Sequence, residues 1–281
     1  TLALGEIGVC PPYSKTFGPG DPWSDIEAFL LAANSRPGGG TLKLVPGFGL
    51  PETLVTSVIT GVVCIEGLPE SAESRVALAG VLFDVYDGGL LTLRSVRVGS
   101  QGPTTIAVRT GGNLFASNIE TPNSEDDPSA NGLCLSVDYG GFVQVQNSEL
   151  CASRNHGVML LERCQIGAYC NFFTVGVPVG IDNSGYLLLS NANVHGRNDK
   201  YCGRPYSGGI WNQASGVVTM VGSTIAKNLA SSENSSFGGI YNEGHLEIAR
   251  SIVADNTATS EEDPDDWIPA DCVGIPAIDL G

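Results

Sequence analysis

The chain has 281 residues, 37 of them glycine, and a formal net charge of −16 at pH 7. A protein this acidic is not expected to bind nucleic acid, because that affinity depends on basic side chains that neutralise phosphates. The sequence contains no run of about 18 apolar residues, which excludes a membrane-spanning helix. We expect Thr1 to follow a leader that is removed on export.

The first predicted element is an amphipathic helix over residues 24–34. Ser24 and Glu27 have the spacing of a capping box. In this motif the side chains of a serine at the N-cap and a glutamate at N3 each accept a hydrogen bond from the backbone N–H of the other residue. The helix would end at Pro37 and shield an open sheet edge, so we interpret residues 1–40 as an N-terminal cap region. The apolar residues of its buried face are predicted to be Ile26, Phe29, Leu30 and Ala33.

From Gly180 onward the chain repeats itself with a period of about 30 residues, which is typical of a solenoid. In each repeat a glycine precedes apolar or small residues two, four, seven and nine places further on. The break in two-residue alternation between the fourth and seventh places indicates a bend between two short strands. The repeats are GIDNSGYLLLSNANV at 180–194, GIWNQASGVVTMVGSTI at 209–225 and GIYNEGHLEIARSIV at 239–253.

The same frame follows Gly89, Gly112 and Gly141 with weaker identity. Stacked coils of this kind bury a continuous apolar column that no single coil could bury. The sequence therefore predicts an all-β protein, a parallel β-helix with coils over residues 41–281, in one domain of residues 1–281. Leu189, Met220 and Ile248 are expected to point inward on successive coils.

Asparagines recur at equivalent places of these coils. Asparagine tolerates a left-handed backbone and bonds to its own kind, so we interpret them as stacked residues at turns rather than as ligands for a substrate. They are Asn183, Asn212 and Asn242, and, after the third strand of each coil, Asn198, Asn228 and Asn256.

The N-terminal segment resembles that of bacterial right-handed β-helix proteins that carry a CSLREA motif. Ser24, Glu27 and Ala28 match this motif, as do the Ala-Ala-Asn at 32–34 and the Pro-Gly at 37–38. The GGIxN repeats and SIVADNTA at 251–258 are similar to repeats of polymorphic outer-membrane and adhesin-like proteins, and GGGTLKLVPG at 38–47 to the first strand of pectin-lyase-like enzymes. The resemblance implies a right-handed β-helix that is secreted or on the cell surface, and it transfers no catalytic residue.

Eight cysteines without a C-x-x-C pair favour disulfides over a metal site, and hence an oxidising, exported setting. Buried unpaired thiols remain the alternative for Cys64 and Cys134, which lie in apolar runs. Asn234 begins the one N-glycosylation pattern, which by itself is weak evidence of export.

The sequence offers weak evidence for a cofactor. Calcium could bind carboxylates of an acidic run near the C-terminus, although a solvated charge run is favoured because EF-hand spacing is absent. The candidate ligands are Glu261, Glu262, Asp263, Asp265 and Asp266.

Length variation falls after the third strand of the coils, at 151–157, 195–208, 226–238 and 254–271, which would place these loops along one edge. The edge concentrates basic residues that could hold a uronate and abstract its C5 proton, as a polysaccharide lyase requires. We favour the interpretation that these cations balance nearby carboxylates. The candidates for catalysis are Arg154, His195, Arg197, Asp199, Lys200 and Lys227.

Trp211 and Tyr241 occupy equivalent places that alternation puts on the outer surface of neighbouring coils. Such a pair suits a sugar ring or another subunit, although an aromatic side chain covered by its own loop is at least as common.

Two functions follow from these observations. The first is a non-catalytic, secreted or cell-surface β-helix with a structural, adhesive or assembly role, whose partners are glycans or other copies of itself, including filaments. The second is a carbohydrate-active enzyme, a polysaccharide lyase or hydrolase of pectin-lyase-like architecture. Fold alone does not separate them.

Overall fold

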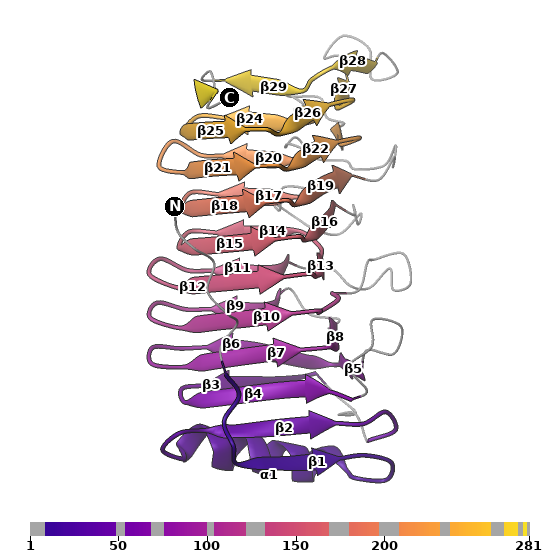
Figure 1. The fold of residues 1–281 in the computed structure, drawn as a ribbon, viewed down its shortest axis with the longest axis vertical. Coiled ribbons are helices and arrows are strands. Elements are labelled where there is room, and N and C mark those ends of the chain that lie inside the picture. The colour runs from indigo at the N-terminus through magenta and orange to yellow at the C-terminus, as the bar shows by residue number, and fades with distance from the viewer. Residues whose placement is uncertain are drawn as a thin grey trace.

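The structure, a computed structural model, describes residues 9–48, 54–68, 76–99, 104–121, 133–168, 180–196, 208–230, 237–259, 267–274 and 278–279. Within them the chain forms one α-helix and a stack of short strands along a single long axis (Figure 1). Every strand pairing is parallel except that of β27 with β28. The prediction of a right-handed parallel β-helix is confirmed.

Sheet A runs the length of the molecule and forms the front of Figure 1. Its strands, in spatial order, are β1 (Ser14–Phe17), β2 (Gly40–Leu44), β4 (Val62–Gly67), β7 (Leu90–Arg94), β10 (Asn113–Ser117), β12 (Phe142–Gln146), β15 (Val158–Glu162), β18 (Tyr186–Ser190), β21 (Val217–Val221), β25 (His245–Ala249) and β30 (Ile278–Asp279).

Sheet B is the second long sheet. Its strands are β3 (Val55–Ile59), β6 (Val81–Val85), β9 (Thr104–Val108), β11 (Leu133–Val137), β14 (Ser153–Asn155), β17 (Ile181–Asn183), β20 (Ile210–Asn212), β24 (Ile240–Asn242) and β29 (Cys272–Gly274).

Sheet C is the third side of the coil. It consists of the pair β5 (Val76–Ala79) and β8 (Val96–Gly99), a bridge at Glu120, and the strands β13 (Glu149–Leu150), β16 (Gln165–Ala168), β19 (Asn193–Gly196), β22 (Thr224–Ala226) and β26 (Ile252–Ala254). A small separate sheet contains β23 (Leu229–Ala230), β27 (Thr257–Thr259) and β28 (Trp267–Pro269).

The chain passes from a strand of sheet A to sheet C, then to sheet B, and then to the next strand of sheet A. Side chains that alternate inward from the three sheets fill the interior with an apolar column. Leu189, Met220 and Ile248 are opposite one another in register, as predicted. The first two are completely buried, and Ile248, near the end of the stack, is half-buried.

A glycine precedes most sheet A strands because the backbone of the previous coil approaches closely there. A Cβ atom added to Gly185 would lie 2.2 Å from the carbonyl oxygen of Gly157, and one added to Gly157 would lie 2.4 Å from that of Gly141. A side chain at either place would force neighbouring coils apart. The glycine frame read from the sequence is therefore a steric requirement of stacking.

The bend from sheet A into sheet C is made by one residue with a left-handed backbone. A φ near +50° favours glycine and asparagine, which accounts for part of this series. The residues are Ser95, Asn118, Asn147, Arg163, Asn191, Gly222 and Arg250.

The predicted asparagine stack exists, but its backbone conformation was predicted wrongly. Asn183, Asn212 and Asn242 end strands of sheet B and do not have positive φ. They are completely buried, and each side-chain amide donates to the next side-chain oxygen, at 2.8 Å and 2.7 Å. Asn155 begins this ladder by donating to Asn183 at 2.8 Å.

A second, shorter asparagine stack lies beyond sheet C. The amide of Asn228 donates to the side-chain oxygen of Asn256 at 2.8 Å, and both residues are buried. Asn198, which was predicted to belong to this stack, lies outside the described residues.

Helix α1 (Trp23–Ser35) covers the N-terminal end of the stack, and the predicted face of Ile26, Phe29, Leu30 and Ala33 is buried. It packs closely, since a Cβ atom added to Gly40 of β2 would lie 2.7 Å from the Cβ of Ala33. The predicted capping box is wrong. The N-cap is Pro22 in extended conformation, without a side-chain cap, so Ser24 already lies inside the first turn.

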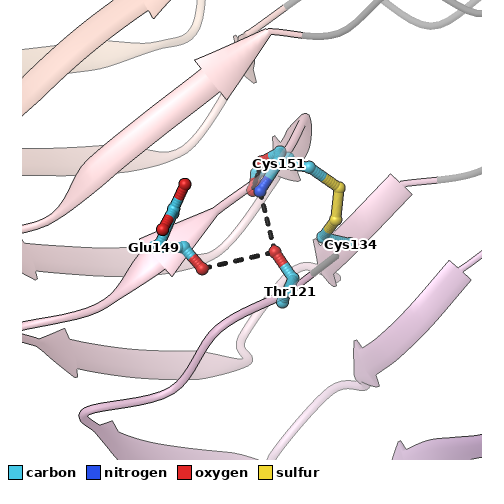
Figure 2. The surroundings of a disulfide bond; sticks show 5 residues. Thr121, Cys134, Glu149 and Cys151 are labelled. Atoms are coloured by element: carbon cyan, nitrogen blue, oxygen red, sulfur yellow. Dashed lines mark hydrogen bonds between the residues drawn. A yellow bond between two sulfur atoms is a disulfide. The ribbon is translucent and has the colours of Figure 1, made fainter. Parts of the chain in front are cut away.

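Two disulfides tie segments of the coil together, Cys10 to Cys64 and Cys134 to Cys151. In Figure 2 the second lies beside Thr121, whose hydroxyl accepts the N–H of Cys151 at 2.9 Å and donates to the carbonyl of Glu149 at 3.4 Å. The alternative of unpaired thiols at Cys64 and Cys134 is therefore wrong.

The remaining cysteines differ in state. Cys164 is a buried free thiol and Cys272 an exposed one, so disulfide formation does not extend to these two cysteines. Desolvation raises the pKa of Cys164 to about 12. Cys170 and Cys202 lie outside the described residues.

Candidate functional site

The structure places the predicted catalytic cations on different sheets. Arg154 lies on β14 of sheet B, where its Nε is 3.2 Å from a carboxylate oxygen of Asp182. His195 is half-buried on β19 of sheet C, and Lys227 is exposed just after β22. Arg197, Asp199 and Lys200 lie outside the described residues, as do the calcium candidates at 261–266.

The prediction of variable loops was partly wrong. Residues 153–155, expected in a loop, form β14, because here the chain connects sheet C to sheet B through Cys151 and Ala152 alone. Parts of the other three expected loops form the end of β19, β23, and β27 with β28. Arg154 is consequently a strand residue of the outer face of sheet B, and it does not lie on a loop.

Among the described residues, Cys10, Cys64 and Glu66 are the group whose ligand atoms are close enough for a metal, within 4.8 Å of one another. The disulfide between the two cysteines removes the thiolates that a metal would require. This group is therefore a structural clamp on the N-terminal segment.

The outer face of sheet B carries a column of residues in register, one from each coil. Strand pairing places Arg154 opposite Asp182, Asp182 opposite Trp211, and Trp211 opposite Tyr241. Because neighbouring strands lie about 4.8 Å apart, these side chains form one continuous strip. Along the axis of the molecule two charged residues are therefore followed by two aromatic residues.

Trp211 and Tyr241 are bound to the same carboxylate. The indole N–H of Trp211 donates to one oxygen of Glu243 at 3.0 Å, and the Tyr241 hydroxyl donates to the other at 3.3 Å. Burial of the hydroxyl and the neighbouring Glu243 raise the pKa of Tyr241, so the phenol remains a donor at neutral pH. We call Trp211, Phe237, Tyr241 and Glu243 the aromatic platform.

The ring of Phe237 extends this platform. It stacks on Tyr241 with a centroid separation of 3.9 Å and an interplanar angle of 5°. Trp211, Phe237 and Tyr241 are all half-buried, whereas Glu243 is exposed. The sequence left open whether this aromatic pair is exposed or is covered by a loop. The structure shows part of each, because Phe237 covers one face of Tyr241 while the cluster still reaches the surface.

Sequence reasoning missed Phe237 and Glu243. Glu243 follows Tyr241 by two residues, and strand alternation alone would have put it on the same face. Phe237 precedes the strand by a Gly-Gly pair, and its contact with Tyr241 depends on how the chain turns there, which no pattern in the sequence gives.

Further along the same face, Arg109 is held between two carboxylates. Its Nε lies 2.6 Å from Asp84 and its Nη1 lies 3.3 Å from Asp138. The hydrogen bond to Asp84 is the main reason that the pKa of Arg109 is raised, so it stays a cation throughout the accessible range. The cation and both acids are partly solvent-exposed, so each pair contributes only modestly to stability.

The amide of Gln213 completes the polar lining near the platform. Its Nε2 donates to Asp182, the same carboxylate that Arg154 contacts. Carboxylate, guanidinium and amide groups thus lie beside the aromatic platform on neighbouring coils. Such a surface offers apolar area together with hydrogen-bond donors and acceptors, which is suited to a ligand with both characters.

No protein-family model matches the chain, and no curated protein sequence matches it significantly. Among solved structures, it is similar to the crystal structure of pectate lyase Pel9A, with 11% identity and a TM-score of 0.41 over 96% of this chain and 80% of that one. A TM-score this low gives no argument about function, and the fold assignment rests on the strand registers.

Proposed function

We propose that this protein is an exported β-helix that binds glycan chains on the outer face of sheet B, in an adhesive or structural role. The observation that supports this best is the aromatic platform. Trp211 and Tyr241 are in register, and both donate to Glu243. Aromatic rings accept the apolar C–H face of a sugar, and the exposed carboxylate accepts its hydroxyl groups.

Charge favours a neutral glycan over a polyanion. Asp182 and Glu243 border the platform, and Arg154 is engaged with Asp182. The chain carries 30 acidic and 14 basic residues, so its field repels a uronate polymer. A neutral sugar avoids this repulsion while keeping the stacking energy.

The same observations disfavour cleavage of the glycan backbone by a lyase. That reaction requires cations beside the uronate and a base at C5 in one place, whereas Arg154 lies on sheet B and His195 on sheet C. We therefore propose binding without backbone cleavage as the primary activity.

Export is supported by the two disulfides, since such bonds persist mainly in oxidising compartments. Among the described residues no helix has the length and apolarity to cross a bilayer. We propose a secreted or cell-surface location on the strength of the disulfides.

A glycan array probed with the purified protein tests this function. We expect binding to neutral glycans, and a loss of at least about tenfold in Trp211→Ala, which corresponds to about 1.4 kcal/mol of binding energy. Tyr139→Ala is the matched control, because Tyr139 is 81% exposed and lies outside the platform. No binding by the intact protein, or equal binding by Trp211→Ala, would refute the proposal.

A lyase assay tests the alternative enzyme. Incubation with pectate, alginate or glycosaminoglycan, with and without calcium, should give no unsaturated uronic product that absorbs in the ultraviolet. Formation of that product, and its loss in Arg154→Ala, would establish the lyase in place of the binding protein.

A further inference from the structure

A second column, just beyond the C-terminal ends of the sheet B strands, holds a carboxylate, an imidazole, a hydroxyl and an amide on four successive coils. These residues each follow the last inward residue of a sheet B strand, and the strand registers place them in one line. We call this set the acid–base column. It consists of Asp138, His156, Ser184 and Gln213.

The backbone holds the column at fixed spacing. The N–H of His156 donates to the carbonyl of Val137, that of Ser184 to Asn155, and that of Gln213 to Asn183, each at 2.8 Å. The acceptors of Ser184 and Gln213 are themselves members of the buried asparagine ladder. The column is therefore anchored to the backbone of the buried asparagine ladder.

The central contact lies between imidazole and hydroxyl. Nδ1 of His156 is 2.5 Å from Oγ of Ser184, and both residues are half-buried and so reachable from solvent. In the tautomer with its proton on Nε2, the imidazole accepts the serine proton at Nδ1. This is the relationship between base and nucleophile that covalent catalysis requires.

The flanking members have complementary chemistry. Asp138, one coil before His156, is oriented by Arg109 at 3.3 Å and places a carboxylate on the coil next to the imidazole. Gln213, one coil after Ser184, donates one amide hydrogen to Asp182. An amide nitrogen has two hydrogens, so the second can donate to an oxyanion that forms at the serine.

We propose that Ser184 is the nucleophile of an acyl-ester hydrolase site, with His156 as its base. Oγ of Ser184 attacks the ester carbonyl while its proton passes to Nδ1 of His156. The alcohol leaves with that proton, and an acyl group remains on Ser184. Water then attacks this ester, losing one proton to His156, and the carboxylic acid is released as Oγ recovers its proton.

The aromatic platform indicates the class of ester. Trp211 lies on β20, the strand paired with β17, which ends one residue before Ser184. A sugar on the platform would present its O-acyl substituents to the serine. This choice of substrate rests on the proposed glycan binding, whereas the nucleophile itself does not.

A fluorophosphonate probe tests the nucleophile without any sugar. We expect covalent labelling that peptide mass spectrometry assigns to Ser184, its loss in Ser184→Ala, and labelling at least about 100-fold slower in His156→Asn, as for loss of a general base. Ser136→Ala is the matched control, since Ser136 lies on the same face, opposite Arg154. It should label like the wild type.

Absence of labelling, labelling that persists in Ser184→Ala, or an unchanged rate in His156→Asn would each overturn this proposal. Thermal unfolding of every variant shows whether loss of labelling reflects loss of the fold. If Ser184→Ala does not fold, Ser184→Cys takes its place, because it keeps a nucleophile at this position. The new thiol should then react with iodoacetamide. Labelling of Ser184 without glycan binding would refute only the proposed function.

Discussion

The side-chain amide of Asn183 donates to the side-chain oxygen of Asn212 at 2.8 Å, with both residues completely buried. The same nitrogen also donates to the carbonyl of Gly185 at 3.1 Å. Asn183 thus bonds both to the next coil and to its own turn. The ladder fixes the bend between sheets B and A on successive coils.

Asn183→Ala should destabilise the protein by at least about 2 kcal/mol, because partners on both neighbouring coils lose a buried hydrogen bond. Asn193→Ala is the control, since Asn193 is exposed and its loss should cost within about 0.5 kcal/mol. Urea unfolding followed by circular dichroism measures both. Equal effects would show that the ladder does not contribute to stability.

The apolar column predicts a graded cost along the stack. Leu189→Ala should cost about 2–5 kcal/mol as a buried truncation. Ile248→Ala should cost less, because Ile248 is half-buried near the end of the column. The same unfolding assay compares them, and a cost near zero for Leu189→Ala would mean that the register is wrong.

The two free thiols should differ in reactivity. Cys272 is exposed and should react with iodoacetamide in the native protein, whereas buried Cys164 should react only after unfolding. Partial desolvation of the sulfur and, secondarily, the charge of Asp271 raise the pKa of Cys272, so its thiolate fraction at a given pH is lowered and its rate of reaction should still be rising above pH 9. Peptide mapping separates the two sites, and modification of native Cys164 would contradict the burial.

Helix α1 should prevent association through the N-terminal end of the stack. Ile26→Asp places a charge on its buried face, which should detach the helix and expose sheet edges that pair with other chains. Light scattering after gel filtration should show larger species for this variant than for Glu27→Ala, an exposed position. Filaments of the intact protein in electron micrographs would instead support the assembly role predicted from the sequence.

The fold could be predicted from the sequence because the stacking of coils requires the same residue types at the same places in each coil. Glycine positions and inward residues were predicted from spacing alone, and registers such as Leu189 opposite Met220 confirm them. One coil was missed, although Gly157 precedes Met159, Leu161, Cys164 and Ile166 in the same frame. It was missed because the connection before β14 is so short that this coil falls well below the repeat length of the other coils.

The candidate site was harder to predict because it depends on contacts between coils. Trp211 and Tyr241 follow from alternation, but the stacking of Phe237 on Tyr241 depends on a turn whose path no periodicity encodes. His156 and Ser184 lie in segments of different length, so only strand register reveals that they are opposite. Arg154 was placed on a loop because the shortest coil had not been recognised.

Fluorescence of Trp211 reports on glycan binding at the aromatic platform itself. A variant with Trp23→Phe and Trp267→Phe leaves Trp211 as the remaining tryptophan. The first change should be tolerated, because the buried indole nitrogen of Trp23 has no hydrogen-bond partner among the described residues. Titration with a neutral glycan selected on the array should shift the emission of Trp211 to shorter wavelength and reach saturation. Binding that leaves this emission unchanged would place the glycan elsewhere and refute the proposed role of the aromatic platform.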